Sequence, residues 1–158
     1  MRARVSVRDA ALYLGSSFLL LAIIVRYVWV LWVFRQSEWY FSTFLFAFVP
    51  ILVLALAAYV ISVPRVPTPD VRAHYLAEAR PFYYLMVVFV VLWSLSDLFN
   101  ASRFAAASFP PAIFAMRALG IIAALVLAHT KKSVLHGVLL SLAGVAVMVV
   151  SVALVSRL

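Results

Sequence analysis

Three charged side chains, Arg26, Asp97 and Arg117, interrupt stretches of sequence that are otherwise apolar. A charge deep in a membrane-spanning helix costs about 2.5–3.5 kcal/mol, so such residues usually face the interior of a helix bundle and find a partner there. Asp97 is the one acidic residue of the three, and we expect it to pair with Arg26, with Arg117 or with both. Further hydrogen bonds are expected from Ser94, Ser96 and Asn100.

This polar cluster has two possible roles. It can be a structural clasp that joins three helices, or it can line a polar pocket or ion path that opens towards the outer side of a membrane. Because two of its three charges are positive, a pocket of this kind would favour anionic ligands. The sequence leaves both roles open.

Residue patterns that indicate catalysis or metal binding are missing. No paired carboxylates, Ser/His/Asp set, HExxH motif or glycine-rich phosphate loop occurs, and the chain has no cysteine. Lys131 and Lys132 lie between His129 and His136 and oppose the binding of a cation. We therefore expect no enzyme, no metal and no cofactor, and we interpret His74, His129 and His136 as solvated or headgroup-contacting residues of loops.

The composition predicts a protein that lies in lipid. Of 158 residues, 68% are hydrophobic and only 11% are charged, and the mean hydropathy is +1.15. A soluble domain of this length could not bury so much apolar surface. The net charge of +8 does not indicate nucleic-acid binding, because the positive charges are spread over short connections.

Five apolar stretches of the sequence position the charges of the polar cluster. The length of each stretch is close to the roughly 20 residues that a helix needs to cross a bilayer. We predict an all-α polytopic membrane bundle that forms a single transmembrane domain over residues 1–158, with spans at about 10–34, 39–63, 82–100, 111–128 and 134–156. Residues 69–80 are predicted to form a separate amphipathic helix on the membrane surface.

The basic residues predict the orientation of the spans. If the N-terminus is cytoplasmic, eight Lys and Arg residues lie inside and three outside, which agrees with the positive-inside rule. The inside set is Arg2, Arg4, Arg8, Arg65, Arg72, Arg80, Lys131 and Lys132, and the outside set is Arg35, Arg103 and Arg157. With five spans, the C-terminus is then outside, and all three intramembrane charges lie in the outer half.

Aromatic residues gather at the expected ends of the spans. Tyr83 and Tyr84 stand at the inner start of the third span, where interfacial Tyr and Trp are common. We interpret them as part of an aromatic belt. Trp93 lies in the middle of that span and does not fit a belt; the alternative is an aromatic ligand cage.

The last span carries small residues at steps of three, four and seven. They are Gly137, Ser141, Gly144 and Ser151. Small residues let helices approach closely in lipid. This face is therefore predicted to pack either against a helix of the same chain or against another subunit.

Two resemblances accompany these patterns. The stretch EWYFSTFLFAFVPILVLALAAYVISVP followed by DVRAHYLAEARPFYYLMVVF resembles a broad group of uncharacterised bacterial polytopic membrane proteins, over about residues 20–95. That resemblance implies a helical bundle in the bacterial inner membrane and no known activity. In size and topology the chain also resembles the tryptophan-rich sensory (translocator) proteins, which bind porphyrins and sterols.

From the sequence we expect a non-enzymatic membrane protein that acts in a complex. It would be an oligomeric pore or transport-type component, or an accessory subunit, with the lipid bilayer and either copies of itself or other membrane subunits as partners. The alternative is a membrane sensor that binds a small molecule or lipid in a pocket near Arg26, Asp97 and Arg117.

Overall fold

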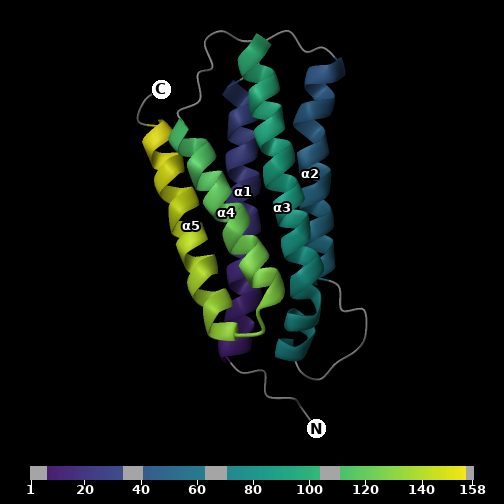
Figure 1. Ribbon diagram of the computed structural model, residues 1–158, viewed down its shortest axis with the longest axis vertical. Coiled ribbons are helices and arrows are strands. Elements are labelled where there is room, and N and C mark those ends of the chain that lie inside the picture. The colour runs from purple at the N-terminus through teal and green to yellow at the C-terminus, as the bar shows by residue number, and fades with distance from the viewer. Residues whose placement is uncertain (1–6, 34–40, 63–70, 104–110, 156–158) are drawn as a thin grey trace.

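In the computed structural model, the described part of the chain forms five helices (Figure 1). They are α1 (Val7–Val33), α2 (Phe41–Ser62), α3 (Val71–Arg103), α4 (Pro111–His129) and α5 (Ser133–Val155). The structure describes residues 7–33, 41–62, 71–103 and 111–155, and these residues are helical except for the turn at Thr130–Lys132. The predicted all-α class is confirmed, and each predicted span overlaps one helix.

Helix α3 differs from the prediction. Instead of a surface helix over 69–80 followed by a separate span, one helix runs from Val71 to Arg103 with Pro81 inside it. The reason is a buried face that continues in phase on both sides of the proline, because residues three or four apart share a helix face. That face consists of Tyr75, Glu78, Ala79, Phe82, Tyr83, Met86, Phe89 and Trp93. Residues 69 and 70 lie outside the described residues.

The helices run up and down, and α3 occupies the middle of the packing (Figure 1). It packs most extensively against α2 and α4, whereas α1 packs mainly against α5 and touches α2 and α3 less. The Tyr27 hydroxyl on α1 donates a 2.8 Å hydrogen bond to the carbonyl of Ala47 on α2. This packing places side chains of α1, α4 and α5 next to side chains of α3.

A tight turn sets the position of α5 relative to α4. The Thr130 amide still bonds to the Val126 carbonyl at 3.1 Å, and the amides of Leu135 and His136 bond to the Lys132 carbonyl at 3.0 and 3.3 Å. One helix therefore ends and the next begins within three residues, at Thr130–Lys132. This turn places His136, in the first turn of α5, next to the backbone of Thr130.

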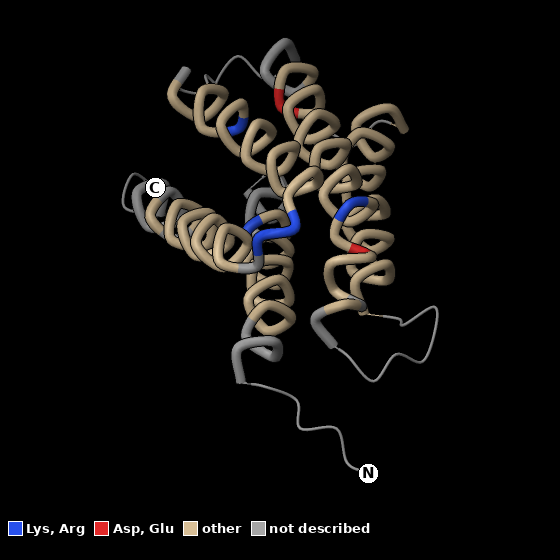
Figure 2. Tube along the Cα trace, turned by 60° about the horizontal axis from the view of Figure 1, so that its bottom comes forward, with Lys and Arg blue, Asp and Glu red and all other residues tan. Residues whose placement is uncertain are grey.

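The outer surface of the bundle is apolar. Every helix exposes large aliphatic side chains, for example Leu14, Leu52, Val91, Leu119 and Val145. Soluble proteins rarely expose such surfaces continuously. Within the described residues, three helical segments are long and apolar enough to cross a membrane: Phe41–Ser62, Tyr75–Phe99 and Ala112–His129. Charged positions are sparse along the helices (Figure 2), and the chain has the character of a membrane protein.

Candidate functional site

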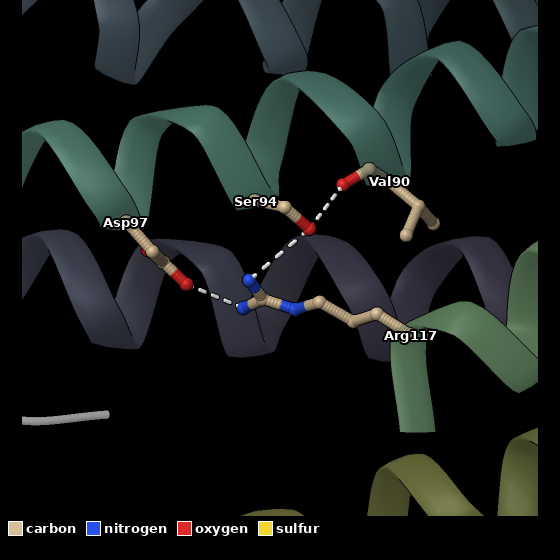
Figure 3. Close-up of polar contacts among 4 residues, drawn as sticks. All are labelled: Val90, Ser94, Asp97 and Arg117. Atoms are coloured by element: carbon tan, nitrogen blue, oxygen red, sulfur yellow. Dashed lines mark hydrogen bonds and ion pairs between the residues drawn. The ribbon is translucent and has the colours of Figure 1, made fainter. Parts of the chain in front are cut away.

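The predicted ion pair forms between α3 and α4. Arg117 Nη2 lies 2.5 Å from Asp97 Oδ2, and Arg117 Nη1 donates to Ser94 Oγ at 3.4 Å. The Ser94 hydroxyl in turn donates to the carbonyl of Val90 at 2.8 Å, so it accepts from the arginine with its free lone pair. Figure 3 shows the extended Arg117 side chain reaching from α4 to these two residues on α3.

Aromatic rings cover the guanidinium. Arg117 Cζ lies 4.5 Å from the ring centroid of Trp93 and 5.6 Å from that of Phe114, distances at which a cation is attracted to the ring face. The side chains of Arg117 and Asp97 are only 11% and 5% exposed. The Arg117 guanidinium is thus covered by two aromatic rings, and both side chains of the pair have little contact with the surroundings of the bundle.

Arg26 on α1 joins the same cluster through Trp93. Its Cζ lies 5.8 Å from the Trp93 ring, which also packs edge-on against Tyr27 at 5.5 Å between centroids. Trp93 therefore stands between both arginines and links α1, α3 and α4. Four of the predicted cluster residues are brought together: Arg26, Ser94, Asp97 and Arg117. Ser96 is also buried on α3, and the side chain of Asn100 lies outside the described residues.

A second polar cluster lies towards the opposite end of the bundle, where the sequence did not lead us to expect one. Ser16 Oγ on α1 lies 3.3 Å from Tyr75 Oη on α3, and Tyr75 Oη lies 2.9 Å from Tyr83 Oη. Tyr83 Oη lies 3.3 Å from His136 Nδ1 on α5, and His136 Nε2 lies 3.0 Å from the Thr130 carbonyl oxygen. We call these four side chains, Ser16, Tyr75, Tyr83 and His136, the Tyr–His chain.

The Tyr–His chain overturns two interpretations. His136 was expected in a solvated loop and Tyr83 in an interfacial belt, but they are 0% and 3% exposed. The available signal was helical phase: Tyr83 lies four residues from Ala79 and eight from Tyr75, and His136 lies four residues from Leu140, all of them buried. His129, in contrast, is exposed, and its Nε2 lies 3.1 Å from Tyr84 Oη.

The hydrogens of the Tyr–His chain can be counted. A carbonyl only accepts, so His136 Nε2 must donate to Thr130, and the Ser16 hydroxyl donates to the Leu12 carbonyl at 2.9 Å. With a neutral imidazole, Tyr83 donates to Nδ1 and Tyr75 donates to Tyr83, which leaves the Ser16–Tyr75 contact without a hydrogen of its own.

The two glycines of α5 have open space beside them in the part of the chain that the structure describes. Outside the adjacent backbone of α5 itself, no described atom lies within 4 Å of where a Cβ would stand at Gly137 or Gly144. The exposed Ser141 hydroxyl donates to the Gly137 carbonyl at 2.8 Å, and the Ser151 side chain lies outside the described residues. Packing of this face against a helix of the same chain and packing against another subunit both stay predictions.

Fold and clusters together define an all-helical bundle with an apolar outside and two buried polar clusters inside. Comparison of the chain with protein-family models, with curated proteins and with solved structures finds no match. The resemblances noted in the sequence therefore stay predictions.

Proposed function

We propose that the protein is a non-enzymatic, multi-pass membrane subunit that acts within a complex in the bacterial inner membrane. All five helices would cross the bilayer, with the N-terminus in the cytoplasm and the C-terminus outside. One observation carries the proposal: the polar side chains of both clusters point inward and bond within the chain, while apolar side chains cover the outside.

The side chains in the middle of the bundle favour the role of an accessory subunit and disfavour a pore that runs through a single chain. Between the two clusters α3 contributes the buried Met86 and Phe89, and α1 contributes Leu19, Leu20 and Ile23. These side chains form an apolar layer, which opposes a continuous path for ions. The aromatic rings that cover Arg117, and the low exposure of both Arg117 and Asp97, likewise support a structural clasp rather than an open ligand pocket.

Two surfaces support assembly with further subunits. Helix α4 is the least buried of the three long apolar helices, and α5 has free space at Gly137 and Gly144. Small residues on an open helix face allow the close approach of another helix in lipid. Copies of this chain or other membrane subunits are both suitable partners for these faces.

The orientation can be tested with cysteine labelling, because the chain contains no cysteine. In intact cells, a membrane-impermeant thiol reagent should label Ser37→Cys, between α1 and α2, from outside. It should label Lys131→Cys, in the α4–α5 turn, only after the cells are opened. The reverse pattern, or labelling of both positions from outside, would overturn the proposed topology.

Assembly can be tested by purification in a mild detergent followed by native mass spectrometry. An accessory subunit should co-purify with a larger membrane partner and should give no conductance in liposomes. Stable homo-oligomers with conductance would instead identify a pore. A monomer that lacks partners and is stabilised by a small molecule, with the stabilisation lost in Asp97→Asn, would overturn the proposal in favour of a sensor.

A further inference from the structure

A group of exposed polar residues lies where the start of α3 meets the α4–α5 turn. Its members are Arg80, Tyr84, His129, Lys131 and Lys132, which we call the basic patch. Figure 2 shows the basic positions of α3 and of the turn at the same end of the bundle. Neither the ion pair nor the Tyr–His chain includes any of these side chains.

Direct contacts join three members of the basic patch across two helices. Tyr84 Oη lies 3.1 Å from His129 Nε2, and the two rings meet edge to face with centroids 6.1 Å apart. Arg80 Cζ lies 5.8 Å from the Tyr84 ring, one helical turn earlier on α3. Tyr84 thus holds an arginine on one side and the last residue of α4 on the other, and the two lysines follow His129 directly in the chain.

The charge of the basic patch is uniformly positive. Arg80, Lys131 and Lys132 each contribute one positive charge. Glu78, the acidic residue two positions before Arg80, is only 7% exposed and so adds little negative charge to this surface. An anion is therefore the complementary ligand.

Apolar residues continue from the basic patch along both helices. On α3 the residues Val88, Val91 and Leu95 follow Tyr84 at steps of four, three and four, and all are exposed. On α4 the exposed residues Ile122, Leu125 and Val126 lie one to two turns before His129. Because Tyr84 contacts His129, these two apolar surfaces start side by side and run away from the charges.

We propose that the basic patch binds the phosphate headgroup of an anionic phospholipid, with an acyl chain along the apolar surfaces of α3 and α4. A charged group at one end and an aliphatic surface beside it match the two parts of such a lipid, and Arg and Lys near a membrane surface attract anionic headgroups. Tyr84 and His129 supply hydrogen-bonding groups at the boundary, where amphipathic side chains are favoured. The inference rests on the proposed placement of the chain in a membrane.

The test is lipid binding by the full-length protein in detergent. Native mass spectrometry would compare phosphatidylglycerol with phosphatidylcholine of the same acyl chains, and inorganic phosphate would serve as a probe without a tail. We expect phosphatidylglycerol to be retained in preference. Each charge removed should weaken retention about fivefold, so that Arg80→Gln/Lys131→Gln/Lys132→Gln weakens it on the order of 100-fold.

Arg157→Gln is the matched control, because it removes the same charge elsewhere in the sequence. It should retain phosphatidylglycerol like the unchanged protein. Thermal unfolding of the triple variant should show that it still folds, since its three substitutions are all at exposed positions. If the triple variant is unstable, the single variants Lys131→Gln and Lys132→Gln provide the same comparison.

Equal retention of both lipids, or an unchanged triple variant, would overturn the proposal. Binding of inorganic phosphate as strongly as phosphatidylglycerol would show an anion site without a lipid tail, and would overturn it too. Alkaline carbonate washing separates this outcome from a failure of the proposed function. A protein that stays in the membrane but prefers no anionic lipid contradicts only the lipid site, whereas release from the membrane contradicts the membrane placement itself.

Discussion

The two buried polar clusters occupy opposite ends of one bundle and are built on different principles. Towards one end, a charged pair, Arg117 and Asp97, joins α4 to α3 under the Trp93 ring. Towards the other, neutral hydroxyls and an imidazole join α1, α3 and α5 through the Tyr–His chain. Helix α3 supplies residues to both clusters and is the common element.

The two clusters differ in what is left when one of their side chains is removed. In the ion pair each charge is bonded to one group of opposite charge, so deletion of either side chain leaves a buried charge without its bonded counter-charge. A hydroxyl both donates and accepts, and a chain of hydroxyls can therefore redirect its hydrogens when one link is lost. The charged cluster should be intolerant of single substitutions, and the neutral cluster should be more forgiving.

The largest effect is expected at Asp97. Asp97→Leu leaves the Arg117 guanidinium enclosed by rings without its carboxylate, and the loss of one partner of a buried pair costs about 3–5 kcal/mol. The double variant Asp97→Leu/Arg117→Leu should regain much of this loss, since apolar replacement of both partners is often close to neutral. Thermal unfolding in detergent measures both.

The control for this prediction is Lys131→Gln, which removes an exposed charge and should leave the melting temperature nearly unchanged. A charge reversal provides the strictest comparison. If Asp97→Arg folds with an unchanged melting temperature, the ion pair contributes nothing to stability, and the contrast between the two clusters disappears.

An intermediate effect is expected in the Tyr–His chain. Tyr83→Phe removes the hydroxyl between Tyr75 and His136, and a buried polar group left without its partner costs about 1–3 kcal/mol. Tyr75 can still donate to Ser16, so the loss should fall at the lower end of this range. The free energy of unfolding measures it, and a loss as large as that of Asp97→Leu would contradict the idea of a forgiving chain.

The sequence revealed the charged cluster but not the neutral one, for a physical reason. A charge in an apolar stretch is costly and therefore conspicuous, and Arg26, Asp97 and Arg117 were recognised by type alone. Tyr and His are ordinary at the ends of membrane helices, so their type carries little information. Only the helical phase of Tyr83 and His136 distinguishes them from exposed Tyr and His residues at helix ends. The phase shows on which face of its helix each residue lies, but whether that face is buried depends on how the other helices pack against it.

The fold, like the polar clusters, was predictable from the sequence only in part. Hydropathy located all five helices, because long apolar runs can only be helical when lipid surrounds them. It did not show that α3 continues through Pro81, because a proline at the start of an apolar run reads as the first residue of a new helix. The in-phase residues Tyr75 and Ala79 before Pro81, with Phe82 and Met86 after it, carry that information instead.

The smallest effect is expected at Tyr84, and it provides the sharpest comparison because Tyr83 is its neighbour. Both tyrosines contact a histidine, Tyr83 at 3.3 Å and Tyr84 at 3.1 Å, but the first contact is buried and the second is exposed. Water can replace the partner of an exposed hydroxyl, so Tyr84→Phe should change the free energy of unfolding by no more than about 0.5 kcal/mol. The same substitution one residue earlier should cost clearly more. If the two variants lose equal stability, burial does not determine the contribution of these Tyr–His contacts, and the Tyr–His chain is no more than a set of side chains that happen to lie close together.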